Sequence, residues 1–345
     1  MIIRLYIEMI YNLPPNAADV ERFVSPTSLF GDLTLLARTV RGGDDDRTTA
    51  DANGSTMQRP LFLRAAALTL LVLLGACTRL ERLALPDAQI TDSHWQQHDA
   101  ASGERVDHAA WDRFLARYVV PDATGVALVD YGAVTPADRG ALDAYLDRLY
   151  ATRVTALNRD EQLAYWVNLY NARTVAVILE HYPVATIRDI KFGGGAFTIG
   201  PWNEPLVTVE GRALSLNDVE HEIIRPIWRD PRIHYVVNCA AIGCPNLGRQ
   251  AYRGATIDAQ MTAAARAYVN DPRGASIDDA GRLTVSKIYV WFEEDFGGSQ
   301  AGVLAELARY AEPELKARLA GRSRIDGYEY DWSLNDAAAV SDTAS

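Results

Sequence analysis

The stretch Arg232-Ile-His-Tyr-Val-Val-Asn-Cys-Ala-Ala-Ile-Gly-Cys-Pro-Asn246 contains two of the three cysteines of the chain. Residues 233–237 are apolar or β-branched apart from His234, a composition that predicts a half-buried strand. The chain then passes through Cys239 and Gly243, which predicts a loop. Reactive side chains are therefore expected where a strand ends, a common place for functional sites.

Length and charge narrow the classes of partner. The chain has 345 residues, is 48% apolar and carries a formal net charge of −11. It can bury a substantial core. Its acidic balance, without a basic patch, argues against nucleic acid and against electrostatic binding to an anionic membrane. Small molecules, peptides and glycans remain as candidate partners, and the sequence predicts no cofactor.

A segment near the N-terminus predicts a lipoprotein signal peptide. Met57-Gln-Arg-Pro60 with Arg64 is cationic, Ala65–Leu74 is apolar, and Leu74-Gly-Ala-Cys77 ends the segment. The apolar run is too short to span a bilayer. The segment resembles the bacterial lipobox, which implies cleavage before Cys77 and attachment of acyl chains such as palmitate to that cysteine.

The signal peptide sets further expectations for the N-terminal region. Because such a signal begins a chain, residues 57–76 are expected to be removed and residues 1–56 to be a non-native extension from an over-extended start. Residues 77–104 are expected to be a lipidated tether. Thr78, not Asp, follows the cysteine. By resemblance to enterobacterial sorting, this implies lipid anchoring in the outer membrane, facing the periplasm.

The remaining pattern predicts one α+β domain over residues 105–335, in which several amphipathic helices pack on a small, largely antiparallel sheet. Residues 336–345 are expected to be disordered. The predicted N-caps of successive helices are Asp107, Thr135, Asn158, Ser215 and Thr256, and a last helix is expected over Gln300–Tyr310. Strands are predicted over Val126–Tyr131, Leu206–Val209, Ala213–Leu216 and Leu283–Val285, and the second and third are expected to form a hairpin around Glu210-Gly211-Arg212. Lys191–Phe197 is glycine-rich and is expected to be a mobile loop without phosphate-binding character.

Two amides lie on the helix predicted after Asn158. Asn168 and Asn171 are i, i+3 neighbours, so their side chains point the same way. They either bond across to another element or line a pocket, and the periodicity does not distinguish these alternatives.

The Cys239 and Cys244 pair allows four interpretations. In an oxidising compartment the pair predicts a structural disulfide. In nucleophilic catalysis Cys239 would attack as a thiolate, with His221 or His234 as the base and Asn238 as an orienting group. The third interpretation is a zinc site made by both histidines and both cysteines. The fourth is that the cysteines are small buried side chains and the histidines are satisfied core residues.

Several blocks resemble the bacterial and plant family catalogued as domain of unknown function 547. The blocks are Tyr165–Ala172, Leu214–His221 with Arg225, Asp230–Cys239 with Cys244-Pro245, Ser286–Tyr289 and Tyr330–Asn335, within a signature over residues 158–335. The resemblance implies that the motif residues of the helices and of the cysteine loop converge on one site. The residues expected to be catalytic are Cys239, His221, His234, Asn238 and Glu220, and those expected to bind are Asn168, Tyr170, Asn171 and Arg225.

The family is named for lacking an assigned activity, so the expected function comes from the residues. We expect a lipid-anchored envelope protein that acts as a cysteine-dependent hydrolase or transferase on an amide or thioester. The alternatives are a non-enzymatic binding or envelope-assembly module with a structural disulfide, and a zinc-binding domain.

Overall fold

The computed structural model describes residues 81–82, 85–192 and 199–338. Arg82–Ser345 forms one compact unit. The predicted extension, the signal peptide, Cys77 and most of the glycine-rich loop lie outside the described residues. Among the residues that are described, none of the helices combines the length and apolar character that crossing a bilayer requires.

The fold is α+β, as predicted. The α-helices are α5 (Ala109–Tyr118), α6 (Pro136–Tyr150), α7 (Arg159–His181), α8 (Arg225–Trp228), α9 (Ile257–Val269), α10 (Ile288–Trp291), α11 (Gln300–Tyr310) and α12 (Pro313–Leu319). The strands are β1 (Val119–Pro121), β2 (Ala127–Val129), β3 (Val207–Val209), β4 (Arg212–Leu214), β5 (Ala275–Ile277), β6 (Leu283–Ser286) and β7 (Gly327–Glu329). Helix α12 follows the helix that the sequence predicted to be the last.

The strands in the described residues form three separate small sheets instead of one. β1 pairs with β2 and β3 with β4, both antiparallel. The third sheet has the order β5-β6-β7, with an antiparallel first pair and a parallel second pair. The β3–β4 turn is the predicted hairpin, and Glu210 and Gly211 both have positive φ, as a tight two-residue hairpin turn requires.

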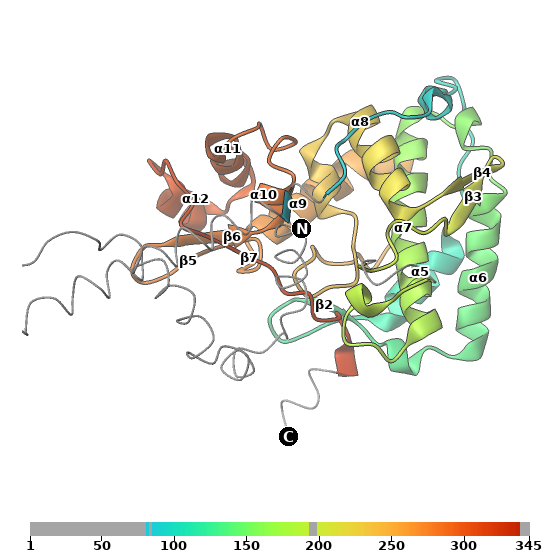
Figure 1. Ribbon diagram of the computed structural model, residues 1–345, viewed down its shortest axis with the longest axis horizontal. Helices are drawn as coiled ribbons and strands as arrows, with labels where there is room; N and C mark the ends of the chain where they lie inside the picture. The colour runs from blue at the N-terminus through green and yellow to red at the C-terminus, as the bar shows by residue number, and fades with distance from the viewer. Residues whose placement is uncertain (1–80, 83–84, 193–198, 339–345) are drawn as a thin grey trace, which may run out of the picture. The chain divides into compact units, whose positions relative to one another are not determined.

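Helix α7 is the centre of the helical part of the fold. Helices α5, α6 and α7 lie side by side, and the β3–β4 hairpin lies close to α6 (Figure 1). The side chain of Asn158 accepts a hydrogen bond from Glu161 N–H and caps α7, as predicted. Most of α7 is buried, including Asn168 and Asn171, so this helix carries polar groups into the interior.

Residues 233–237 do not form the predicted strand. Pro231–Tyr235 is a 3-10 helix, η6, which begins with a proline and is capped by the side chain of Asp230, an acceptor for Arg232 N–H. The apolar run is buried on all sides, so its apolar composition was not evidence for the alternating faces of a strand.

The helix predicted after Ser215 opens as expected. Ser215 Oγ accepts a hydrogen bond from Asp218 N–H, and Asp218 Oδ2 accepts one from Ser215 N–H. This reciprocal cap satisfies backbone donors at the start of the helix.

Pro226 does not end this helix, although a proline in a helix interior usually does. Asp218–Ile224 is a π-helix, η5, which continues directly into α8. Proline has no N–H to donate, and the carbonyl of His221 instead accepts a hydrogen bond from Gln89 N–H. A π-helix is often found at a functional site.

Residues 85–104 pack against the domain, which differs from the tether expected there. Trp95 is buried in the core. Asp92 Oδ2 lies 2.7 Å from Arg212 Nε. At the other end of the domain, Asp336 is also buried, although it begins the segment expected to be disordered.

Two hydrophobic cores meet at the stretch that opened the sequence analysis. Val236, Val237 and Ala240 belong to the larger core around α7. Tyr235 belongs to the second core, which involves α9, α11 and the β5-β6-β7 sheet. The cysteine loop, residues 239–244, thus follows the point where the chain passes from one core to the other.

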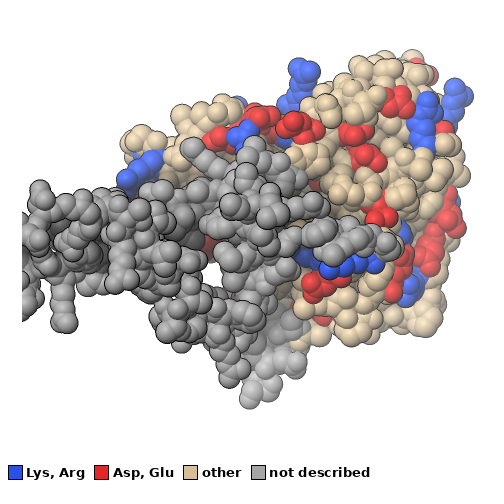
Figure 2. Space-filling view, in the orientation of Figure 1, with Lys and Arg blue, Asp and Glu red and all other residues tan. Residues whose placement is uncertain are grey.

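The described part of the surface in Figure 2 mixes both signs of charge. Acidic and basic side chains are intermingled on this face, and its described part presents no continuous basic area.

Candidate functional site

The cysteine loop is held by backbone contacts with the C-terminal segment. Ile242 N–H donates to Ser333 O and Gly243 N–H to Asp331 O, both at 2.8 Å. A Cβ on Gly243 would lie 2.9 Å from the ring of Tyr330, so only glycine allows this close approach. The contacts bring Tyr330 onto the two thiols.

Both thiols contact one hydroxyl group. Tyr330 Oη lies 3.1 Å from Cys239 Sγ and 3.0 Å from Cys244 Sγ. Cys239 N–H also donates to Cys244 Sγ at 3.1 Å. Both cysteines are free in the structure, and Cys239 is partly exposed whereas Cys244 is buried.

The two thiols have opposite pKa shifts. The hydrogen bond with Cys244, together with burial, raises the pKa of Cys239 well above its usual range. Burial also raises the pKa of Cys244, but hydrogen bonds from Cys239, Tyr330 and backbone N–H groups outweigh burial and lower it. Burial raises the pKa of Tyr330 well above its usual range, so its hydroxyl remains a donor. Cys244 is therefore the better thiolate, while Cys239 is the more accessible sulfur.

The amide predicted to orient a catalytic group instead shapes the loop. Asn238 Oδ1 accepts from Ala240 N–H, and its Nδ2 donates to Pro245 O. Ala240 has φ +61°, the left-handed region, directly after Cys239. Asn238 thus stabilises the sharp turn that presents the cysteine.

The side chains of both helix amides also hydrogen-bond to backbone groups of other segments. Asn171 Nδ2 donates to Val236 O, and its Oδ1 accepts from Asn238 N–H, each at 2.8 Å. Asn168 makes the same two kinds of bond with the backbone of Tyr252. Of the two alternatives for these amides, bonding across to another element describes the structure.

The two histidines lie in a second group, the histidine cluster, which comprises Glu220, His221, Arg225, His234 and Asp295. His234 Nε2 donates to Asp295 Oδ2 at 2.6 Å, and Arg225 Nε donates to the same oxygen at 2.7 Å. His234 Nδ1 lies 3.9 Å from Glu220 Oε1. The π-helix, α8 and η6 supply all of these groups except Asp295, which follows α10.

His221 is held as a neutral acceptor. Arg225 Nη1 lies 2.8 Å from His221 Nδ1, and because a guanidinium only donates, the ring proton is assigned to Nε2. Burial, followed by the charge of Arg225, outweighs Glu220 and lowers the pKa of His221 to about 4. His221 is thus uncharged near neutral pH. It can accept a proton as a base, but it is not present as the imidazolium that would donate one.

Asp295 is the ionised centre of the cluster. Burial raises its pKa, but the hydrogen bonds and charges of His234 and Arg225 outweigh burial and bring the pKa to about 2. The ring of Phe292 stacks on His234 with centroids 4.3 Å apart, and the Arg225 guanidinium lies over the same ring. Charge and stacking together fix the imidazole of His234.

Glu220 and Tyr170 connect the two groups. Tyr170 forms a side-chain hydrogen bond with Glu220. Glu220 is close enough to Cys239 for its charge to contribute to the raised pKa of that thiol. The thiols, Tyr170, Glu220 and the histidine cluster are therefore neighbours, whereas the bonds of Asn168 go to Ala164 and Tyr252. In the described part of the chain neither imidazole hydrogen-bonds to a sulfur.

The zinc alternative does not match this arrangement. Within residues 85–192 and 199–338, no three His, Cys, Asp or Glu side chains are grouped so that they could hold a metal ion. The thiols face Tyr330 and each other, and the imidazoles face Asp295 and Arg225.

Half-buried aromatic rings surround Tyr330. Trp291 and Trp332 lie 4.8 Å from the ring of Tyr330 between centroids, and Trp202 lies 5.8 Å from Trp332. These rings present apolar surface next to the tyrosine that contacts both sulfurs.

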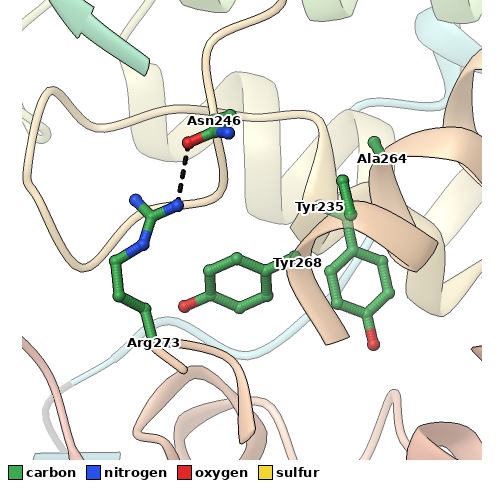
Figure 3. Close-up of a pocket in the computed structure, with 6 residues that line it drawn as sticks. Tyr235, Asn246, Ala264, Tyr268 and Arg273 are labelled. Atoms are coloured by element: carbon green, nitrogen blue, oxygen red, sulfur yellow. Dashed lines mark hydrogen bonds between the residues drawn. The ribbon is translucent and has the colours of Figure 1, made fainter. Parts of the chain in front are cut away.

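A small hollow lies behind the cysteine loop (Figure 3). Arg273 and Tyr268 line it together with Asn246, and Arg273 Nη2 donates to Asn246 Oδ1. Arg273 Nη1 donates to the carbonyls of Ile242 and Cys244, and Tyr268 Oη donates to Gly243 O. Arg273 and Tyr268 therefore brace the carbonyl groups of the loop.

Sequence reasoning missed Asp295, Arg273 and the role of Tyr330. Tyr330 belongs to a block quoted for the family resemblance, which was the one available signal. Asp295 ends the acidic run Glu293-Glu294-Asp295, and Arg273 follows α9 in a turn, so neither stands out from solvated surface charge.

Residues 154–269 match the family described as "Protein of unknown function, DUF547". The match includes both cysteines of the loop and both histidines of the cluster, whereas Asp295 and Tyr330 lie beyond it. No curated protein and no solved structure matches the chain. Residues 154–269 are thus identified as a DUF547 domain.

Proposed function

We propose that this protein is a cysteine-dependent hydrolase or transferase that acts on an amide or thioester. The observation that carries the proposal is the pair of free thiols on Tyr330, of which one is partly exposed and the other accepts a backbone N–H. A thiol attacks only as its thiolate, and hydrogen-bond donors around the sulfur stabilise that form.

The geometry favours Cys239 as the attacking group and Cys244 as its proton acceptor. Cys239 Sγ forms a bond to the acyl carbon while its proton passes to the Cys244 thiolate. Cys244 then returns the proton to the departing amine or thiolate as the bond between the acyl carbon and that group breaks. Water or a second acceptor releases the acyl group from Cys239.

The histidine cluster serves this pair by position and charge. His234 and His221 are fixed by Asp295 and Arg225, and Glu220 links the cluster to the thiols through Tyr170. The half-buried rings of Trp291 and Trp332 would contact apolar parts of the substrate.

Acylation of the full chain tests the proposal. The Cys77→Ser variant leaves two thiols, and a simple acyl thioester serves as probe. We expect an acyl adduct on Cys239, detected by peptide mass spectrometry, and none in Cys239→Ser. Cys244→Ser should slow acylation at least tenfold with an unchanged circular dichroism spectrum.

An adduct that persists in Cys239→Ser would contradict the proposal. If neither thiol is acylated, and serine at either cysteine only lowers stability, the non-enzymatic binding or envelope-assembly module becomes the better description.

We also propose that Cys77 carries the lipid that anchors the protein at the outer membrane, facing the periplasm. The cationic, apolar and Leu-Gly-Ala-Cys segments in sequence support this. Labelled palmitate should be incorporated by the wild-type chain and not by Cys77→Ser, and the variant should leave the membrane fraction. Incorporation that persists in Cys77→Ser would refute the assignment.

A further inference from the structure

We propose that Cys239 and Cys244 form a reversible disulfide and exchange it with a disulfide-bonded substrate, so that the domain has thiol–disulfide oxidoreductase activity. This activity goes beyond acyl transfer and uses the same thiols. It has its own readout, the oxidation state of the two sulfurs, so either proposal can fail alone.

The sulfurs are placed as a reacting pair. Both sulfurs contact Tyr330 Oη at 3.0–3.1 Å, and the backbone N–H of Cys239 donates to Cys244 Sγ at 3.1 Å. Cys239 is partly exposed and Cys244 is buried. This asymmetry suits a sulfur that meets the substrate and a second sulfur that resolves the mixed disulfide.

The loop between them is braced at both its carbonyl groups and its N–H groups. Arg273 and Tyr268 hold its carbonyls, and Asp331 and Ser333 hold its N–H groups. Because the backbone is held, conversion between dithiol and disulfide requires movement of the two cysteine side chains and changes their contact with Tyr330.

The reaction balances with a substrate disulfide as the only co-reactant. Cys239 passes its proton to the Cys244 thiolate as its sulfur attacks one substrate sulfur, the substrate S–S bond breaks, and Cys244 gives the proton to the departing thiolate. Cys244 then attacks Cys239 Sγ, which forms the internal disulfide and releases the second substrate sulfur as a thiol. The two cysteines lose two electrons, and the substrate sulfurs gain them.

Tyr330 favours the reduced state in this scheme. Its hydroxyl hydrogen-bonds to the thiol and thiolate of the dithiol form, and a disulfide sulfur is a weaker acceptor. Removing the hydroxyl should therefore make the disulfide harder to reduce.

The test incubates the full chain, as Cys77→Ser, with oxidised glutathione and follows intact mass and alkylation. The wild-type pair should lose two hydrogen atoms and both alkylation sites, and dithiothreitol should restore them. In Cys244→Ser a glutathione adduct should persist on Cys239, whereas in Cys239→Ser the buried Cys244 should react at least tenfold more slowly. Insulin reduction with dithiothreitol as electron donor tests protein disulfides as substrates.

Several outcomes would overturn the inference. These are a persistent adduct on the wild-type pair, equal reaction of the two single variants, or an internal bond that dithiothreitol does not reduce, which would mark a structural disulfide. Tyr330→Phe should shift the glutathione equilibrium toward the disulfide by about tenfold, equivalent to about 30 mV for this two-electron couple. An unchanged equilibrium would remove Tyr330 from the scheme. Normal exchange without an acyl adduct would leave this inference standing and reject acyl transfer alone.

Discussion

The cysteine loop and the histidine cluster are both buried, yet they are stabilised by different interactions. In the cysteine loop, neutral hydroxyl and backbone groups surround two thiols. In the histidine cluster, an ionised carboxylate is shared by an arginine and an imidazole. The difference teaches that the loop keeps reactive atoms without ionic partners, whereas the cluster uses its charges to fix geometry.

The largest effect should come from breaking the cluster. Asp295→Ala leaves the buried Arg225 and His234 without their shared carboxylate, and we expect a loss of about 3 kcal/mol in unfolding free energy. Urea denaturation measures the loss. Arg282→Ala, which removes only the exposed pair with Asp278, is the control and should have no measurable effect. Equal stability of the two variants would show that the cluster does not hold the fold.

The next effect is a pH dependence of stability to which His221 of the cluster contributes. The pKa of His221 is about 4 in the folded chain, against an ordinary value of 6.5. Between these values the unfolded chain binds a proton that the folded chain does not, so stability is complete above pH 6.5 and falls toward pH 4.

The full decline from His221 amounts to about 3 kcal/mol. His221→Gln, which stays neutral, should remove this part of the slope in urea denaturation measured across that range. His108 is also buried with its pKa lowered to about 4, so His108→Gln should remove a comparable part. A slope that neither variant changes would contradict the assigned neutral state.

A smaller effect is expected from filling the space beside the loop. The Cβ in Gly243→Ala would lie 2.8 Å from Asp331 N, so the loop must move and stability should fall by about 2 kcal/mol. Gly140→Ala, on α6 with open space around it, should instead stabilise by about 0.5 kcal/mol. Thermal denaturation of both variants measures these changes. A Gly243→Ala variant as stable as the wild-type chain would show that the loop is not tightly held.

The smallest expected effect concerns the thiols of the cysteine loop alone. Tyr330→Phe removes the hydroxyl that contacts both sulfurs and can donate to a thiolate, so the pH midpoint of thiolate formation should rise by the equivalent of about 1.5 kcal/mol. Thiolate absorbance against pH measures it. Tyr268→Phe, whose hydroxyl bonds Gly243 O and Ser286 Oγ, should leave the midpoint unchanged. A shift in both variants would trace the effect to loop packing.

Local signals predicted much of the framework. Caps at Thr135 and Asn158, the hairpin turn at Glu210-Gly211 and the strand at Leu283 are set by neighbouring residues, and each was found as predicted. The apolar run at residues 233–237 was misread because burial on all sides produces the same composition in a strand and in a short helix.

The site itself depended on contacts between distant parts of the chain. The residue types in the motifs indicated Cys239, Cys244, His221 and His234, because few side chains perform such chemistry. Tyr330 and Asp295 became visible only when folding brought them within hydrogen-bonding distance across 86 and 61 positions of the chain. Spacing along the sequence carries no record of such partners, so tertiary structure alone decided which group each thiol and each imidazole faces.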